Sequence, residues 1–345
     1  MSSSQRNSMQ GFALYRQPYA HEYTLVAGDV EECASYSDLI GKKGFVIAPF
    51  SITPKNKLLI VGCERMVRGV DIPPLPSSDC GETRFSAVTS ARADYQLDFA
   101  NFHARLLNND FQKLVLSRSI EIGRKPGDTP DVLFRKACAS YPRMFISLVY
   151  TPQSGMWLTA TPEILLSGSG DEWQTIALAG TMPYEENIRW SDKNIQEQRY
   201  VATYIIRQLE QFTTDFSESG PRTVRAGHLA HLRSDFHFRL PVKATFGALL
   251  EALHPTPAIC GLPKSEAFRF ILSQEHHDRS YYSGFMGPLA LDNQTHLYVT
   301  LRCMRIFDNA FRLYAGGGLL QDSAEEQEWQ ETEIKLDTMR NIINS

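Results

Sequence analysis

The hydrophobic positions of the chain follow two periods, which together predict a mixture of strands and helices. Short apolar runs bounded by turn-forming residues, at 44–50 and 57–63, are typical of strands. In residues 91–107 the apolar side chains recur every three or four positions, which predicts a helix. Between these elements, residues 71–83 collect Pro, Ser and Gly and are expected to form a surface connection.

The middle of the chain continues this mixture. Residues 113–122 alternate in the manner of a strand, and residues 131–142 predict a helix that ends at a proline. The clearest helix is expected over 190–212, where Ser191 or Asp192 can cap the N-terminus. Three further strand segments are expected at 144–151, 156–168 and 172–181.

The C-terminal part predicts a hairpin followed by a long helix. Two apolar segments, 296–307 and 311–320, flank Asp308-Asn309, a pair of residues that favours a tight turn. Residues 324–343 show helical periodicity with acidic residues in the first turn. Because strands and helices occur in groups rather than in strict alternation, we expect α+β layers.

Composition and charge exclude several classes of protein. Hydrophobic residues make up 43% of the 345 positions, which is too many for a disordered chain. The 35 basic and 39 acidic residues give a net charge of −4, whereas a general nucleic-acid binder needs a basic excess. No apolar segment is long enough to span a membrane, and the first residues do not resemble a signal peptide. We therefore expect a cytoplasmic protein with no nucleic-acid or membrane partner.

The C-terminal helix carries the first candidate for chemistry. Glu328, Glu331 and Lys335 stand at i, i+3 and i+7, so they share one helical face. Two carboxylates on one face suit a hard divalent cation, and the ammonium group could hold an anion bound to the same metal. The alternative is an ordinary solvated face, because acidic residues in a first helical turn also stabilise the helix dipole.

Two anion-binding candidates precede that helix. Three successive glycines, Gly316 to Gly318, end a predicted strand before a helix and would let an anion approach the backbone N–H groups. A flexible turn is the alternative. Arg302, on the preceding predicted strand, would share a face with Thr300 and Met304 and could grip a carboxylate with its two nitrogen donors. The alternative is a surface arginine on an edge strand.

Four further residues could act in acid–base or metal chemistry. Lys113 opens a predicted strand, where burial would favour the neutral amine, although many strand lysines merely lie at edges. Glu163 follows a proline between two apolar segments and is either a protonated acid or a solvated loop carboxylate. His254, followed by Pro255, is either functional or structural. Glu197 lies beside the apolar stripe of the 190–212 helix and is either a metal ligand or a flanking residue.

Taken together, eight motifs stand in the order found in one family. They are KLVLSR (113–118), TPEILL (161–166), LAGT (178–181), LHPTPAICGLP (253–263), YYSGFMG (281–287), TLRC (300–303), YAGGG (314–318) and EWQETEIK (328–335). Residues 111–345 thereby resemble the chorismate-utilising enzymes. This family includes isochorismate synthases, salicylate synthases and the synthase components for anthranilate and aminodeoxychorismate.

The resemblance implies a fold and an activity. The expected fold is α+β, with two stacked, largely antiparallel sheets flanked by helices and the site in the cleft at their edges. Residues 1–345 are treated as a single chorismate-binding catalytic domain, with a less diagnostic part at 1–110 and the motifs at 111–345. A lysine at position 113 is typical of the family members that add water to chorismate. The resemblance therefore implies an isomerase, isochorismate synthase. The alternative is salicylate synthase, which then eliminates pyruvate.

The resemblance also assigns roles to the candidates. Lys113 would be the base that activates water, and Glu163 the acid that protonates the departing hydroxyl. Mg²⁺ would be held by Glu197, Glu328 and Glu331. The substrate, chorismate, would be bound by Thr181, His254, Arg302, Gly316, Gly317 and Lys335. The expected protein is a monomer, and the product could enter menaquinone, siderophore or other biosynthesis.

The chain departs from the family pattern in three places. Gln198 replaces the usual histidine after Glu197, and Ile334 replaces the usual asparagine before Lys335. The middle glycine, Gly317, is commonly alanine in the family. These differences affect the expected metal affinity and the nearest relative more than the class of enzyme.

Overall fold

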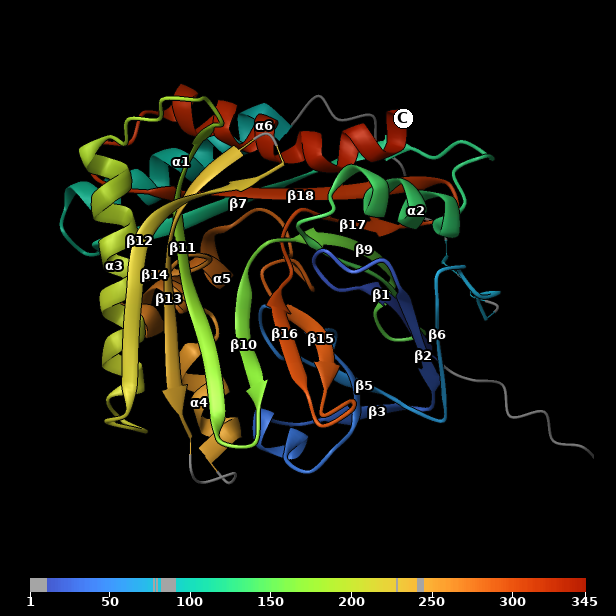
Figure 1. Cartoon of the computed structure of the whole chain (residues 1–345). Coiled ribbons are helices and arrows are strands. Elements are labelled where there is room, and N and C mark those ends of the chain that lie inside the picture. Colours follow the sequence, from blue (N-terminus) through green and yellow to red (C-terminus); the bar gives the residue numbers. More distant parts are fainter. Residues whose placement is uncertain (1–10, 77, 79, 82–90, 228, 241–244) are drawn as a thin grey trace, which may run out of the picture.

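In the residues that it describes, the computed structural model contains two stacked β-sheets of nine strands each, with helices on their outer faces (Figure 1). The structure describes residues 11–76, 78, 80–81, 91–227, 229–240 and 245–345. Every pairing between neighbouring strands of the two sheets is antiparallel. The predicted α+β fold with two stacked antiparallel sheets is therefore confirmed.

The first sheet, sheet A, carries most of the C-terminal motifs. In spatial order its strands are β14 (Gly261–Leu262), β7 (Lys113–Gly123), β18 (Ala310–Leu319), β17 (Cys303–Ile306), β9 (Gly155–Thr161), β8 (Phe145–Thr151), β1 (Gly11–Arg16), β2 (Tyr23–Gly28) and β6 (Arg65–Gly69). The long strands β7 and β18 pair over ten residues and form the part of the sheet next to the site described below.

The second sheet, sheet B, faces sheet A. Its strands are, in spatial order, β12 (Phe216–Ala226), β13 (Leu229–Arg239), β11 (Glu172–Pro183), β10 (Ile164–Ser169), β16 (Thr295–Val299), β15 (Phe285–Leu289), β4 (Gly44–Ala48), β5 (Leu58–Gly62) and β3 (Val30–Cys33). The N-terminal part of the chain thus contributes three strands to each sheet, although its sequence carries no diagnostic motif.

Helices cover both sheets from outside. The helices are a short 3₁₀ helix, η1 (Tyr36–Leu39), and α1 (Ala91–Leu107), α2 (Pro130–Ser140), α3 (Asp192–Leu209), α4 (Phe246–Leu253), α5 (Lys264–Gln274) and α6 (Glu325–Asn344). α1, α2, α5 and α6 contact sheet A and α3 contacts sheet B, whereas α4 contacts α3 and η1 and places Phe246 against Trp173 of sheet B. In the part of the chain that the structure describes, none of these helices is long and apolar enough to cross a membrane.

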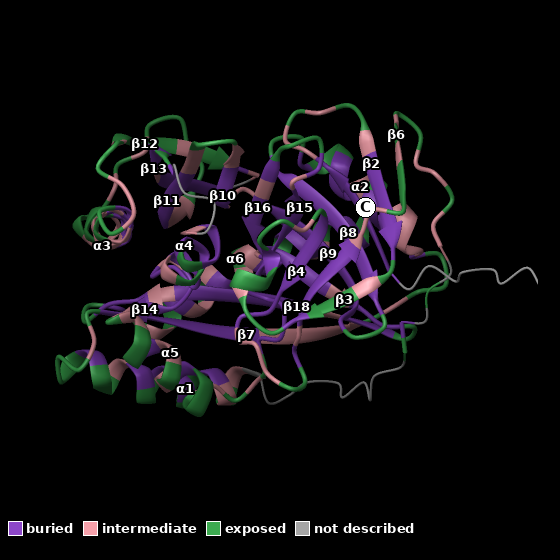
Figure 2. Ribbon diagram, turned by 90° about the horizontal axis from the view of Figure 1, so that it is seen from below, coloured by how far each residue is buried: buried purple, intermediate pink, exposed green. Residues whose placement is uncertain are grey.

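The space between the sheets is filled mainly by aromatic and aliphatic side chains. Trp157 and Tyr281 are fully buried there, and Tyr314 stacks on Trp157 with ring centroids 5.4 Å apart. Figure 2 shows that the buried positions concentrate on the central strands, whereas α1 and α3 expose one face. This dense filling confines polar chemistry to one end of the interface between the sheets.

Several predicted elements differ from the observed ones. The strand expected at 156–168 is split into β9 and β10 at Pro162 and Glu163, where the chain crosses from sheet A to sheet B. The strand expected at 296–307 is split in the same way into β16 and β17. Arg302 lies in the irregular link with a φ of +46°, so its predicted place on a strand face beside Thr300 and Met304 is wrong.

The glycine segment also differs from the expected turn. Gly316 to Gly318 lie inside β18 and are paired with Ser117, Leu116 and Val115 of β7. The flexible-turn interpretation is therefore wrong. Part of the predicted connection at 71–83 (residues 77, 79, 82 and 83) lies outside the described residues, and the described part contains neither helix nor strand.

Candidate active site

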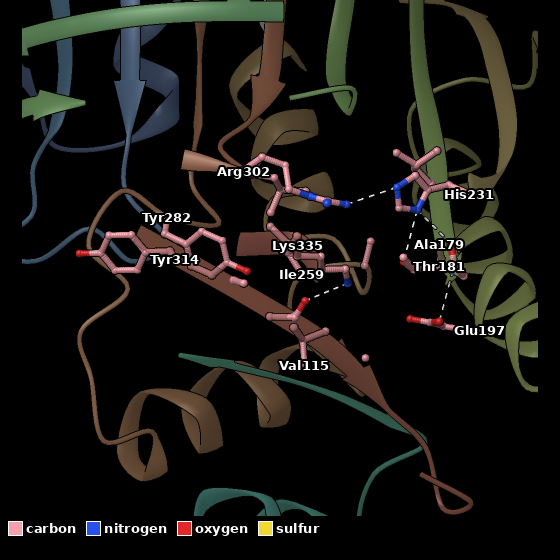
Figure 3. A pocket seen from close by; sticks show the side chains of 17 residues that line it. Val115, Ala179, Thr181, Glu197, His231, Ile259, Tyr282, Arg302, Tyr314 and Lys335 are labelled. Atoms are coloured by element: carbon pink, nitrogen blue, oxygen red, sulfur yellow. Dashed lines mark hydrogen bonds between the residues drawn. The ribbon is translucent and has the colours of Figure 1, made fainter. Parts of the chain in front are cut away.

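A cavity opens between the two sheets at the end where β7, β11, β13 and β18 meet (Figure 3). Sheet A, sheet B, α3 and α6 all supply side chains to it. Its polar lining consists of Thr181, Glu197, His231, Tyr282, Arg302, Tyr314 and Lys335. The apolar lining includes Val115 and Ile259. The motifs of the sequence are thus brought to one place by strands that belong to different sheets.

Lys113 and Glu197 form a buried ion pair at the edge of this cavity. Lys113 opens β7 on the inward face and is fully buried, and its Nζ lies 2.9 Å from Oε1 of Glu197 on α3. Gly318 of the neighbouring strand makes room for the pair, since a Cβ there would lie 2.8 Å from Cε of Lys113. Burial by itself would raise the pKa of Glu197, but the charge and hydrogen bond of Lys113 lower it below its ordinary value.

A bulge in β11 directs a backbone N–H group to Glu197. The register of β11 against β13 shifts at Gly180, which has a φ of +69° that only glycine adopts easily. The N–H of Gly180 donates to Oε2 of Glu197 at 3.3 Å. Its carbonyl faces Nδ1 of His231 at 3.0 Å, and Oγ1 of Thr181 lies 3.3 Å from the same nitrogen.

His231 is a neutral imidazole that joins this bulge to Arg302. Its pKa is lowered to about 3, first by burial and then by the positive charges of Arg302 and Lys335. If Nδ1 carries the proton and donates to Gly180, Nε2 is left to accept from Nη2 of Arg302, which lies 3.3 Å away. The imidazole therefore orients the guanidinium group rather than adding a charge.

Two cations from different elements reach the cavity. Arg302 is 7% exposed, and burial lowers its pKa below the ordinary value for arginine. Lys335 of α6 donates from Nζ to the carbonyl of Gly316 at 2.9 Å and contacts Oε1 of Glu331 at 2.6 Å. The carbonyl of Gly316 therefore points away from β7, and in a strand the N–H of the same residue points to the same side. Gly316 thus offers a backbone donor beside the two cations.

The three glutamates predicted to bind metal are each paired with a lysine. The pairs are Glu197 with Lys113, Glu328 with Lys193 and Glu331 with Lys335. Glu328 is 1% exposed, and burial together with the nearby charge of Glu331 raises its pKa. A Cβ on Gly317 would lie 3.5 Å from a carboxylate oxygen of both Glu328 and Glu331, so these two side chains converge on the glycine strand.

Glu163 is the second predicted proton-transfer residue. It occupies the crossing between β9 and β10 and is 3% exposed. Burial raises its pKa to about 7, and the positive charges of Lys113, Arg302 and Lys335 limit the rise. A carboxyl group with this pKa is partly protonated at neutral pH, as a general acid must be.

The carboxylates of Glu197, Glu328 and Glu331 are the candidate ligands for a divalent cation. Within the described ranges, no three acidic, histidine or cysteine side chains are gathered closely enough to hold a metal as they stand. The glutamates supply carboxylate oxygens, which hard cations prefer. Their present partners are lysine side chains. The residues therefore fit Mg²⁺, provided that the lysines give up their contacts.

His254 is a predicted site residue that lies apart from the cavity lining and its ion pairs. It ends α4, is 2% exposed, and packs edge-on against the rings of Tyr36 and Phe285. Burial lowers its pKa to about 3, so it is neutral. This environment corresponds to the structural alternative raised for His254 from the sequence.

Three participants were missed by sequence reasoning. His231 lies on β13. The sequence does not predict the β12–β13 hairpin, because the exposed strand β12 lacks a clear apolar period. Gly180 was part of a quoted motif, but nothing in the sequence marked it as a bulge. Lys193 stands four residues before Glu197 on the predicted helix, and this spacing could have shown that both lie on one face.

The fold is shared with a solved structure. The crystal structure of DhbC from Bacillus anthracis superposes with a TM-score of 0.82 at 22% identity, covering 99% of this chain and 98% of that chain. At this identity the likeness defines the fold: two stacked antiparallel sheets with flanking helices. The cavity between the sheets, lined by cations and paired carboxylates, is typical of a site for a small anionic substrate.

Sequence comparison then identifies the family. The chain is similar to isochorismate synthase EntC of Escherichia coli K12, with 30% identity over 242 residues, 67% of this chain and 62% of EntC. It is 31% identical over 265 residues to isochorismate synthase DhbC of Bacillus subtilis strain 168, covering 71% of this chain and 66% of that protein. The matches thus span somewhat less than two thirds of these relatives. The model of the chorismate binding enzyme family matches residues 76–344, and the chain belongs to this family.

Proposed function

We propose that this chain is an isochorismate synthase, an isomerase that adds water at C2 of chorismate and removes the hydroxyl group at C4. One observation carries the proposal: the chain buries a lysine and a carboxyl group with a pKa of about 7 beside a cavity that holds two further cations. The names of the two relatives support it. Water enters and water leaves, so the reaction needs no redox partner.

The proposed acid–base step uses Lys113 and Glu163. Lys113, as the free amine, takes a proton from a water molecule whose oxygen forms the bond to C2. The ring double bonds shift, and the bond between C4 and its oxygen breaks. Glu163, in its protonated form, gives its proton to the departing oxygen, which leaves as water. Each of the two proton transfers contributes about 10²–10⁴-fold in rate.

Substrate binding is assigned to the cationic wall of the cavity. Arg302 and Lys335 would face the carboxylates of the chorismate dianion, and the N–H of Gly316 would donate to one of them. Thr181 would orient a polar group of the substrate. His231 would hold Arg302 in place through its neutral ring. We do not assign a substrate contact to His254, because its ring is packed in the aromatic core.

We propose Mg²⁺ as the cofactor. The carboxylates of Glu197, Glu328 and Glu331 would hold it, and when bound it supplies charge neutralisation for a substrate carboxylate. We further propose that residues 1–345 act as one catalytic domain. This is supported by the N-terminal strands, which extend both of the sheets that enclose the cavity.

Product identification tests the function directly. Purified protein is incubated with chorismate and Mg²⁺, and the products are separated and weighed by mass spectrometry. Isochorismate has the mass of chorismate and a different retention time, which is the expected result. Fluorescent salicylate together with pyruvate would support the salicylate synthase alternative instead. Lys113→Ala protein serves as the control, and equal conversion by this variant would contradict the assigned base.

A further inference from the structure

The outer edge of β7 is completed by an ion pair instead of a strand. The neighbouring strand β14 has two residues and pairs only with Lys113 and Leu114. Beyond it, the N–H of Val115 donates to the carbonyl of Cys260 at 2.7 Å. The next two backbone groups bind side chains: Nη2 of Arg279 donates to the carbonyl of Val115 at 2.7 Å, and the N–H of Ser117 donates to Oε1 of Glu275 at 2.8 Å. The ion pair thus satisfies buried backbone groups that a strand would otherwise satisfy.

Arg279 and Glu275 are rigidly joined. Both side chains are 2% exposed, and Nε and Nη2 of Arg279 lie 2.7 and 2.5 Å from the two carboxylate oxygens of Glu275. The guanidinium group also packs on the ring of Phe50 at 4.4 Å. A bidentate, buried arginine–carboxylate pair fixes both partners in one geometry.

The same guanidinium group links two walls of the cavity. Besides the carbonyl of Val115 on β7, it binds the carbonyl of Ile259 from Nη1 at 2.7 Å. Val115 and Ile259 both line the cavity, and they come from segments far apart in the sequence. The planar fork of one arginine thus adds two side-chain bonds to the backbone bonds that hold these two walls together.

We infer that Arg279, held by Glu275, is a positioning residue for the active site. It fixes β7 at Val115, and Lys113 lies two residues earlier on the same face, where it meets Glu197. This inference rests on the proposed function for its catalytic consequence. A lysine cannot replace Arg279, because a single nitrogen cannot reach both carbonyl oxygens and both carboxylate oxygens in a fixed plane.

A second cavity makes this role testable by chemical rescue. A surface pocket lies beside the ion pair and is lined in part by Phe50, Glu275, Asp278 and Arg279. Removing the arginine side chain would leave a guanidinium-sized space that opens into this pocket. Small guanidinium ions can then occupy the place of the missing group, whereas sodium ions cannot reproduce its hydrogen bonds.

The first experiment measures kcat and KM of Arg279→Ala with and without millimolar guanidinium chloride, with sodium chloride as the salt control. We expect kcat to fall roughly 10²-fold, the usual result of misplacing a catalytic group by about 1 Å, and guanidinium to restore much of it. Arg269→Ala on α5 is the matched control, since Arg269 is exposed and its one ion-pair partner among the described residues is Glu266. A variant with reduced melting temperature but unchanged kcat would show a merely structural role and overturn the inference.

The second experiment does not depend on activity or on the alanine variant folding. Amide hydrogen exchange of residues 113–118 is compared between the wild type and Arg279→Lys. We expect faster exchange at Ser117 in the variant, since Glu275 loses the partner that holds it against that N–H. If wild-type protein makes no isochorismate, the proposed function fails, while this measurement still tests whether the Arg279–Glu275 pair holds the edge of β7. Unchanged exchange at Ser117 in Arg279→Lys would overturn the inference.

Discussion

Two adjacent glycines of β18 should respond in opposite ways to the same added methyl group. A Cβ on Gly317 would sit 3.5 Å from the nearest atoms of Glu328 and Glu331, which is ordinary contact. A Cβ on Gly318 would lie 2.8 Å from Cε of Lys113 and would overlap the carboxylate of Glu197. We therefore expect Gly317→Ala to be tolerated and Gly318→Ala to disrupt the Lys113–Glu197 pair.

The size of the effect follows from the distances. Ordinary contact begins at 3.4 Å, so Cε of Lys113 must withdraw by at least 0.6 Å in Gly318→Ala, and Glu197 must move as well. Overpacking of this kind costs about 1–3 kcal/mol of the free energy of unfolding. Each alanine restricts the unfolded chain to the same extent, which adds about 0.4–1 kcal/mol to the free energy of unfolding. The difference in this free energy between the two variants therefore reflects the native contacts. Displacing the proposed base should lower kcat/KM about 10²-fold.

The assay measures kcat/KM for chorismate and the urea midpoint of unfolding for both variants and the wild type. Gly317→Ala should remain within about threefold of wild-type kcat/KM, since a shift below 1 kcal/mol corresponds to less than one decade. Equal kcat/KM values for the two variants would refute the reasoning, because only Gly318 adjoins the ion pair. So would a Gly317→Ala variant that is more impaired than Gly318→Ala.

Three further predictions concern the proposed chemistry. Because Glu163 must be protonated and its pKa is raised to about 7, kcat should fall as the pH rises through 7; a flat profile from pH 6 to 8.5 would remove Glu163 from this role. Lys113→Ala should lose turnover by roughly 10²–10⁴-fold while retaining chorismate binding by calorimetry, and near-wild-type kcat would contradict the assigned base. A chelator should abolish activity, and Glu331→Ala should require far more Mg²⁺ than the wild type; superimposable Mg²⁺ titrations would exclude Glu331 as a ligand.

Much of the fold could be predicted because local patterns and tertiary packing agree. The helix at 91–107 was predicted with its observed bounds, and Ser191 caps α3 through its hydroxyl as expected. The two apolar segments that span Glu163 and Arg302 were each predicted as one strand, yet each is split. Their hydrophobic run continues because both halves are buried, one in each sheet, and a buried crossing has no turn signal in the sequence.

Candidate site residues could be named from the sequence, but the contacts between them could not be predicted from it. Glu328, Glu331 and Lys335 could be placed on one helical face from their spacing alone. The partner of each carboxylate comes from tertiary structure, as Lys193 of α3 meets Glu328 of α6. His231 had no motif and no periodic segment to mark it. The Arg279–Glu275 pair was equally invisible, because its four-residue spacing is common and its backbone acceptors lie on β7 and before β14.

The three glutamate–lysine pairs have a consequence for how ligands bind. Within the three pairs the negative and positive side chains offset one another in a largely buried setting. A divalent cation alone, or the chorismate dianion alone, would add two uncompensated charges there, which is costly away from water. Both together add no net charge. Each ligand should therefore strengthen the binding of the other by the same factor. Calorimetry on Glu163→Gln should show tighter Mg²⁺ binding when chorismate is present, and an unchanged dissociation constant would contradict this linkage.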